Sequence, residues 1–222
     1  MAIARALVTE PRLMLLDEPL SNLDMRLRVE MRTEMSVLFR KLKMSVFHVT
    51  HDPEEAFAMA DKLLLMRSGA IDQLDTPTAC YHKPASRQAA SLLGAINVLR
   101  GEFARSSEDA AMDCSAGRLY GTVCGTGGKL QAGASAELRF RPEAVTVLPD
   151  NGSGPAGSGS INSSINRIEA RVIHCTFEGT KWRILAESPQ GERLYLFSEE
   201  HWENGSLIHA ELPRHAAYIY GI

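Results

Sequence analysis

The sequence has no long hydrophobic run, little net charge and few cysteines, and each of these shortages argues against a class of protein. Its apolar stretches fall far short of the roughly 20 residues that a helix needs to cross a bilayer. We expect neither a signal peptide nor direct membrane insertion, so any membrane association should come through a partner. The net charge of −3 gives no argument for binding nucleic acid or an acidic membrane surface.

Four cysteines are spread along the 222 residues without the spacing of a metal site or a redox pair. They are Cys80, Cys114, Cys124 and Cys175. Ordinary thiols in a reducing cytoplasm are the best interpretation. The length suggests one or two domains with apolar cores of useful size.

The segment Leu13–Pro19 reads Leu-Met-Leu-Leu-Asp-Glu-Pro and carries the clearest functional signal. Four successive apolar residues predict a strand buried on both faces, as in a parallel sheet flanked by helices. Asp17 and Glu18 then lie beyond the carboxyl end of the strand, where open parallel sheets bind ligands. An Asp there suits Mg²⁺ on nucleotide phosphates, and a neighbouring Glu suits activation of a water. An ordinary strand with a solvated acidic end stays the alternative.

A long amphipathic helix should follow, beginning with the capping pattern of Ser21 and Asp24. Its apolar residues recur at helical spacing and predict one buried face. They are Leu27, Met31, Met35, Leu38 and Leu42. A second apolar strand at 44–50 completes a strand–helix–strand crossover, so the two strands should be parallel.

That crossover places His51 at the same sheet edge as Asp17 and Glu18. Asp52 can cap the next helix and Pro53 suits its first position. A His at such an edge can donate a hydrogen bond to a terminal phosphate, although an ordinary loop histidine is the alternative. His48 should point to the opposite face of its strand, which argues against a metal site with two histidines.

Together these motifs resemble the ATP-binding subunit of ABC importers, in the branch that serves maltose, polyamine, iron and related uptake. Leu13–Pro19 resembles the Walker B strand with its catalytic glutamate, and Ser21–Asp24 resembles the D-loop. His51 resembles the switch histidine, and Ala2–Leu7 the helix after the signature loop. The resemblance covers essentially the whole chain and is strong as far as Asn97.

The resemblance implies a role for each residue of the motifs. Asp17 would orient Mg²⁺, Glu18 would be the general base, and His51 would contact the γ-phosphate of ATP. Ser21 and Asp24 would also bind ATP, across the interface of a homodimer that encloses two nucleotides. Membrane permease subunits would be the partners, at the cytoplasmic face of the cell membrane.

The chain departs from the family pattern because it contains no G-x-x-x-x-G-K-[ST] phosphate loop. The segment Gly125–Leu130 has the wrong glycine spacing and should be a turn. The glutamine loop, the adenine-stacking aromatic residue and the signature are also absent. Without an amide cradle for the phosphates, we expect this polypeptide not to hydrolyse ATP alone. A truncated product, an expressed fragment, a misplaced start and a degenerate reading frame all stay open.

The resemblance implies that residues 1–95 form the α/β C-terminal half of a P-loop NTPase core, a partial nucleotide-binding domain. A hairpin around Ser68-Gly69 and helices from about Thr76 and Ser86 should complete it.

Residues 96–222 should form an all-β domain, because short apolar segments alternate with Gly- and Ser-rich turns. The resemblance implies that this domain is regulatory. The predicted strands are 98–103, 118–123, 136–140, 144–148, 167–177, 181–186, 193–197 and 207–212. The resemblance implies OB-like (TOBE-type) barrels, on the turn Phe140–Glu143 and the later segment Phe177–Trp182. A mobile loop is expected at 150–166, which is rich in Gly, Ser and Asn.

The function predicted is therefore that of an ATP-binding and ATP-hydrolysing subunit that energises solute import, here truncated and inactive alone. The alternative is a non-enzymatic β module that regulates or binds a ligand, for instance an oxyanion such as molybdate. Basic and aromatic residues of the β domain are too dispersed to favour nucleic acid. The transported solute stays open.

Overall fold

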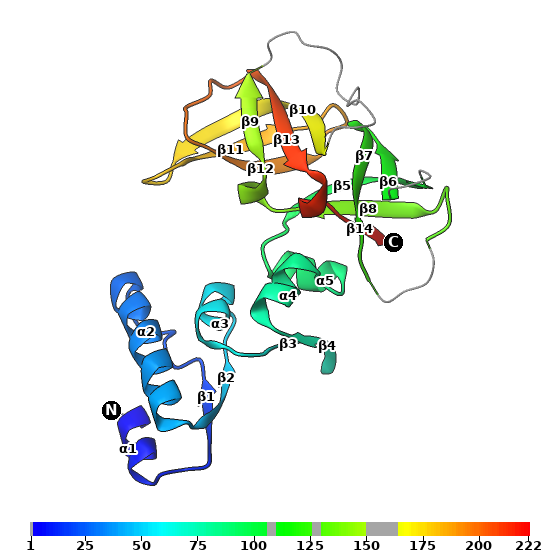
Figure 1. Ribbon diagram of the computed structural model, residues 1–222. Helices are drawn as coiled ribbons and strands as arrows, with labels where there is room; N and C mark the ends of the chain where they lie inside the picture. The colour runs from blue at the N-terminus through cyan, green and yellow to red at the C-terminus, as the bar shows by residue number, and fades with distance from the viewer. Residues whose placement is uncertain (1, 106–109, 126–129, 150–163) are drawn as a thin grey trace. The chain divides into compact units, whose positions relative to one another are not determined.

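The computed structural model describes residues 2–105, 110–125, 130–149 and 164–222. The chain divides into two compact units, Met1–Cys80 (unit 1) and Tyr81–Ile222 (unit 2) (Figure 1). Residues 81–95 thus pack within unit 2, whereas the sequence places the domain boundary at residue 95. The assignment of 1–95 to a partial nucleotide-binding domain stays a prediction.

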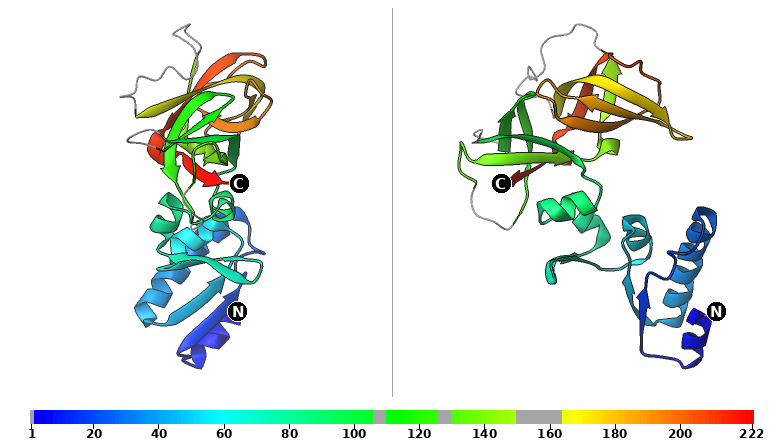
Figure 2. Two further views of the ribbon diagram at one scale, coloured as in Figure 1. Left: turned by 90° about the vertical axis from the view of Figure 1, so that its right-hand side faces the viewer. Right: turned by 180° about the vertical axis from the view of Figure 1, so that it is seen from behind.

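Unit 1 begins with a short helix, which a strand–helix–strand segment, a second short helix and a hairpin follow (Figures 1 and 2). Its elements are α1 (Ala2–Val8), β1 (Leu13–Asp17), α2 (Met25–Leu42), β2 (Ser45–Val49), α3 (Pro53–Met59), β3 (Leu63–Arg67), β4 (Ala70–Asp75) and the start of α4 (Pro77–His82). No helix among the described residues of either unit is long and apolar enough to cross a membrane.

β1 and β2 pair in parallel, with Leu13 beside Ser45 and Asp17 beside Val49. α2 connects them, because a parallel neighbour requires the chain to return to the starting end of the sheet. The predicted crossover is confirmed, and the carboxyl ends of both strands lie at one edge.

β1 is buried on one face only, so the prediction of a strand buried on both faces is wrong. Met14 and Leu16 are buried in a cluster with side chains of α1 and α2. Leu13 and Leu15 point to the other face and are 62% and 69% exposed. An apolar run cannot reveal whether a second layer covers the sheet.

α2 begins one turn later than the predicted cap at Ser21. Asp24 is the capping residue, and its Oδ1 accepts a hydrogen bond from the backbone N–H of Leu27. The Ser21 hydroxyl instead donates to the carbonyl of Glu18. Ser21 therefore belongs to the turn after β1.

The buried face of α2 also differs from the predicted stripe. The two methionines of that stripe are buried or partly buried, but Phe39 occupies the next buried position. Leu27, Leu38 and Leu42 are 38%, 36% and 50% exposed. Both three- and four-residue steps fit a helix of 3.6 residues per turn, so the sequence could not choose between Leu38 and Phe39.

The elements after β2 agree with the sequence. Asp52 caps α3, and Pro53 lies in its first turn. β3 and β4 pair antiparallel around Ser68 and Gly69, whose φ angles of 49° and 79° suit a tight hairpin turn.

Among its described residues, unit 2 contains four short helical segments and ten strands. Its elements are the end of α4, α5 (Arg87–Leu92), β5 (Asn97–Arg105), β6 (Ala110–Cys114), β7 (Gly117–Val123), β8 (Ser135–Phe140), η1 (Pro142–Ala144), β9 (Thr146–Pro149), β10 (Ile165–Phe177), β11 (Trp182–Glu187), β12 (Arg193–Ser198), β13 (Leu207–Pro213), η2 (Arg214–Ala216) and β14 (Tyr218–Gly221).

These strands form a closed barrel in the order β14-β7-β6-β5-β8 and a five-stranded sheet in the order β12-β11-β10-β13-β9. In each arrangement, four consecutive strands pair with a fifth strand from the other half of the unit. The barrel combines β5 to β8 of the first half with β14, and the sheet combines β10 to β13 of the second half with β9. Residues from both halves share one apolar core. The predicted small β architecture is confirmed, and it is a barrel with a companion sheet.

Two buried asparagines join the halves of unit 2 in the same way. Asn97 of β5 donates to the carbonyl of Tyr195 and accepts from its backbone N–H. Asn166 of β10 does the same with Tyr120. Each asparagine thereby extends backbone pairing from one half of the unit to the other.

The sequence missed β6 and β14, and it placed the start of β10 inside the predicted loop 150–166. Residues 165 and 166 belong to β10, so that end of the loop is wrong. Positions 150–163 lie outside the described residues, as do 126–129 of the predicted turn Gly125–Leu130.

Candidate functional site

The candidate site lies where β1 and β2 end. The backbone N–H of Glu18 donates to the carbonyl of Val49 at 2.9 Å, which continues the pairing one residue beyond β1. Glu18 itself has a φ of 43°, an uncommon value for a residue with a side chain. The chain turns sharply there and continues through Pro19.

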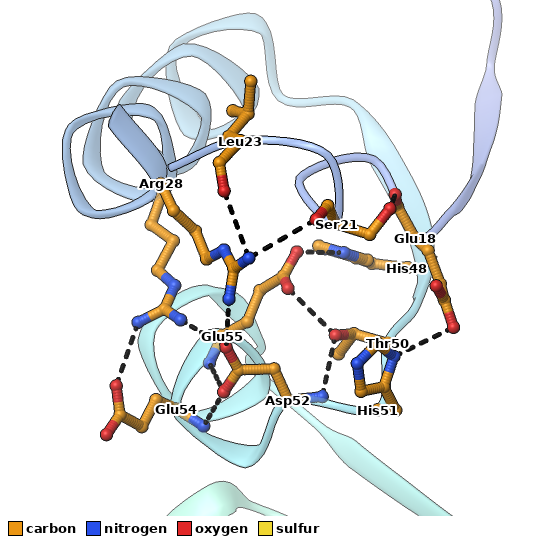
Figure 3. A network of polar contacts seen from close by, with 11 residues as sticks. Glu18, Ser21, Leu23, Arg28, His48, Thr50, His51, Asp52, Glu54 and Glu55 are labelled. Carbon is orange, nitrogen blue, oxygen red and sulfur yellow. Dashed lines mark hydrogen bonds and ion pairs between the residues drawn. The ribbon is translucent and has the colours of Figure 1, made fainter. Parts of the chain in front are cut away.

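Glu18 and His51 come together across this edge, from the ends of neighbouring strands (Figure 3). His51 Nδ1 lies 2.9 Å from Glu18 Oε1. The Glu18 side chain is 47% exposed and that of His51 is 74% exposed, so a ligand in solvent can reach both. Because Nδ1 faces a carboxylate, a neutral His51 would carry its proton on Nδ1 and leave Nε2 as an acceptor.

Asp17 occupies the last position of β1, on the exposed face of the strand. Within the described chain its carboxylate makes no hydrogen bond or ion pair, so its oxygens are available to a ligand. Mg²⁺ is commonly held by one or two carboxylates, substrate phosphates and water, and one free Asp fits that pattern. No group of three or more His, Cys, Asp or Glu side chains suited to a metal occurs in the part of the chain that the structure describes.

Ser21 and Asp24 have local partners. The Ser21 hydroxyl donates to the Glu18 carbonyl at 2.9 Å, and Asp24 caps α2. Ser21 therefore lies directly beside the backbone of Glu18, whereas Asp24 holds the start of the following helix. Their roles toward a nucleotide across a dimer interface stay predictions.

A network of charged residues beside the pair was missed by the sequence reasoning (Figure 3). Arg28 and Arg32 of α2 lie 3.8 Å and 2.5 Å from the carboxylate of Asp52. Arg32 also donates to Glu54 at 3.3 Å. The four-residue spacing of the two arginines is a helical signal, but it looks the same as that of a solvated face.

His48 and His51 serve different partners, as their positions in the strand suggested. His48 Nε2 lies 2.8 Å from Oε1 of the buried Glu55, although the angles do not meet those of a hydrogen bond. The other oxygen of Glu55 accepts a hydrogen bond from the Thr50 hydroxyl. His48 thus belongs to the interior of unit 1, and His51 to its exposed edge.

The arrangement supplies two chemical functions at one accessible edge. A carboxylate beside an imidazole can accept a proton from a bound water, and the imidazole can hydrogen-bond an anionic oxygen. A phosphate group would also need a cradle of backbone amides or a lysine, and the sequence contains no phosphate-loop motif.

No family model matches the chain. The spermidine/putrescine import ATP-binding protein PotA of Rubrobacter xylanophilus is 32% identical over 207 residues, which cover 93% of this chain and 52% of that protein. The Fe(3+) ions import ATP-binding protein FbpC of Brucella melitensis is 40% identical over 157 residues, 71% of this chain and 43% of its own length. FbpC 2 of Rhizobium meliloti is 32% identical over 99% of this chain and 56% of its own length.

A structure of the cytoplasmic molybdate-binding protein ModG superimposes with a TM-score of 0.46 at 15% identity, over 58% of this chain and 96% of that one. The chain spans about half the length of the curated relatives that it matches. Those relatives are import proteins that bind ATP, and the match extends through both units. The chain is therefore homologous, over most of its length, to ATP-binding subunits of ABC importers.

Proposed function

We propose that this chain provides the water-activating part of an ATPase that energises solute import. The observation that carries the proposal is the contact between Glu18 and His51 at the ends of two parallel strands. The homology to import ATP-binding proteins supports ATP as the ligand. Its hydrolysis is what the family resemblance implies. In this proposal β1, α2 and β2 belong to the α/β core of a P-loop NTPase, and unit 2 contains the OB-like regulatory part.

Each residue at the edge has a distinct task in the proposal. Asp17 would hold Mg²⁺, which would supply positive charge against the charge that develops on the phosphates. Glu18 orients the attacking water and accepts its proton. His51 donates a hydrogen bond to the γ-phosphate, in its protonated form or after a change of tautomer, because Nδ1 faces Glu18.

The wider assembly is also a proposal. Two such subunits would enclose two ATP molecules, with Ser21 and Asp24 contributing across the dimer interface. Permease subunits in the membrane would be the partners, with the ATPase at the cytoplasmic face. The net charge of −3 gives no support for a nucleic-acid partner.

A chimera tests the proposed chemistry. Residues 1–222 replace the matching region of the Rubrobacter xylanophilus relative, whose remaining part supplies the phosphate loop that the family resemblance implies. We expect ATP hydrolysis by this chimera, and a loss of about 100-fold or more in turnover for Glu18→Gln, because the base is removed. Steady-state phosphate release measures it.

Glu34→Gln is the matched control, because Glu34 is an exposed glutamate on α2, away from the strand ends. It should leave turnover unchanged. A Glu18→Gln chimera as active as its parent would contradict the role of general base. Calorimetric titration of residues 1–222 alone with Mg-ATP should show no binding, since the chain has no phosphate loop of its own.

A further inference from the structure

Arg28 bridges the two chain segments that carry the candidate site (Figure 3). Its Nη2 donates to the carbonyl of Leu23 at 3.2 Å and to that of Ser21 at 3.4 Å. Its Nη1 lies 3.8 Å from Oδ2 of Asp52. One guanidinium therefore contacts both the turn after β1 and the start of α3.

Both ends of this bridge lead directly to the pair at the sheet edge. On one side the Ser21 hydroxyl and its backbone N–H both donate to the carbonyl of Glu18. On the other side Asp52 is the residue after His51 and is fixed as the cap of α3. The contact between Glu18 and His51 closes a ring of interactions that also contains Arg28.

The chemistry of the side chain suits this task. A guanidinium presents several N–H donors in a rigid plane, so it can serve two carbonyls and a carboxylate at once. The Arg28 side chain is 33% exposed, whereas that of Arg26 on the same turn of α2 is 89% exposed and has only Glu30 as an ion-pair partner in the described chain. Partial burial strengthens the contacts of Arg28 relative to those of a solvated arginine.

We propose that Arg28 is a positioning residue that holds the Ser21–Leu23 turn and the His51–Asp52 segment together, so that Glu18 and His51 keep their contact. The claim that this contact serves ATP hydrolysis rests on the proposed function. The claim that Arg28 maintains the contact rests on the geometry alone. The two claims therefore fail separately.

The tautomer of His51 tests the proposal without nucleotide. Nitrogen NMR of the full chain, at alkaline pH where imidazoles are neutral, distinguishes a proton on Nδ1 from one on Nε2. His51→Gln identifies the signal among the seven histidines. We expect the Nδ1–H form in the wild-type chain and its loss in Arg28→Met, where His51 becomes an ordinary solvent-exposed imidazole. Arg26→Met should keep the wild-type signal.

Arg28→Lys keeps the charge but cannot reach all three oxygens, so it should lose the Nδ1–H form in part. Helical circular dichroism shows whether each variant is folded, and Arg28→Lys decides the matter if Arg28→Met unfolds. Retention of the wild-type signal in the folded Arg28 variants would overturn the proposal, and so would an equal loss in Arg26→Met. An inactive chimera with a clear loss in Arg28→Met would remove the proposed function and leave the positioning role.

Discussion

Unit 1 and unit 2 are each stabilised internally, but by different kinds of interaction. Of the largest fully buried side chains, all but Leu20 belong to unit 2, where barrel and sheet share one apolar core. Unit 1 buries a small cluster around Met14, Leu16 and Phe39, and its elements are also joined by ionic contacts between α2 and α3. The candidate site therefore lies in the unit that depends more on charge.

The exposed face of β1 and β2 strengthens this contrast. Leu15 and Phe47 are 69% and 50% exposed, and they are neighbours across the parallel pair. In unit 2, by contrast, large apolar side chains of the strands, for example Leu138 and Ile184, are fully buried. Apolar burial is the main source of stability in proteins, so the free energy of unfolding should differ between the units.

The largest effect is expected from a core truncation in unit 2. Leu138→Ala removes a fully buried side chain of β8 and should lower the free energy of unfolding by about 2–5 kcal/mol. Both tryptophans, Trp182 and Trp202, lie in unit 2, so denaturation followed by tryptophan fluorescence reports on this unit. Leu148→Ala is the control, because Leu148 is 36% exposed and its truncation should matter much less. Equal losses would mean that this core is not what stabilises the unit.

An intermediate effect is expected from a charge in unit 1. Arg32→Met keeps an apolar stem but leaves Asp52, which is 20% exposed, without its closest cation, and should cost about 2 kcal/mol. Unit 1 contains no Trp or Tyr, so helical circular dichroism and hydrogen exchange of α2 and α3 are the measurements. Arg40→Met is the control, since Arg40 is 71% exposed. If it destabilised unit 1 as much as Arg32→Met, the ionic account of unit 1 would be wrong.

Local signals in the sequence predicted much of this architecture. The Asp52 cap, the turn at Ser68-Gly69 and most strands of unit 2 were predicted, because each depends on residues close together in the chain. β14 was missed although Tyr218-Ile219-Tyr220 is rich in strand-forming residues. β6 has a weaker signal, since three of its five residues are two alanines and an aspartate.

Properties that depend on what packs against an element could not be predicted in the same way. The number of covered faces of β1 and the choice of Phe39 over Leu38 follow from tertiary packing. At the site, the approach of His51 to Glu18 was predictable from the crossover, because parallel strands end at one edge. The bridging position of Arg28 was not, because a partly buried arginine on a helix has the same sequence pattern as an exposed one.

The smallest effect is expected from an exposed charge in unit 2. Arg118 donates two hydrogen bonds to Asp113, at 2.7 Å and 2.8 Å, and these lower the pKa of that carboxyl. A lowered folded pKa contributes stability at pH values above the ordinary Asp pKa of about 3.9, and this stability is lost as the pH falls through the folded pKa. Since both side chains are about half exposed, solvent screens the pair. Arg118→Met should thus destabilise unit 2 several-fold less than Leu138→Ala at neutral pH, and the difference from wild type should vanish in acid. Fluorescence-monitored denaturation at several pH values measures it, and a difference that persisted below the folded pKa would show that Arg118 stabilises the unit through packing of its stem instead.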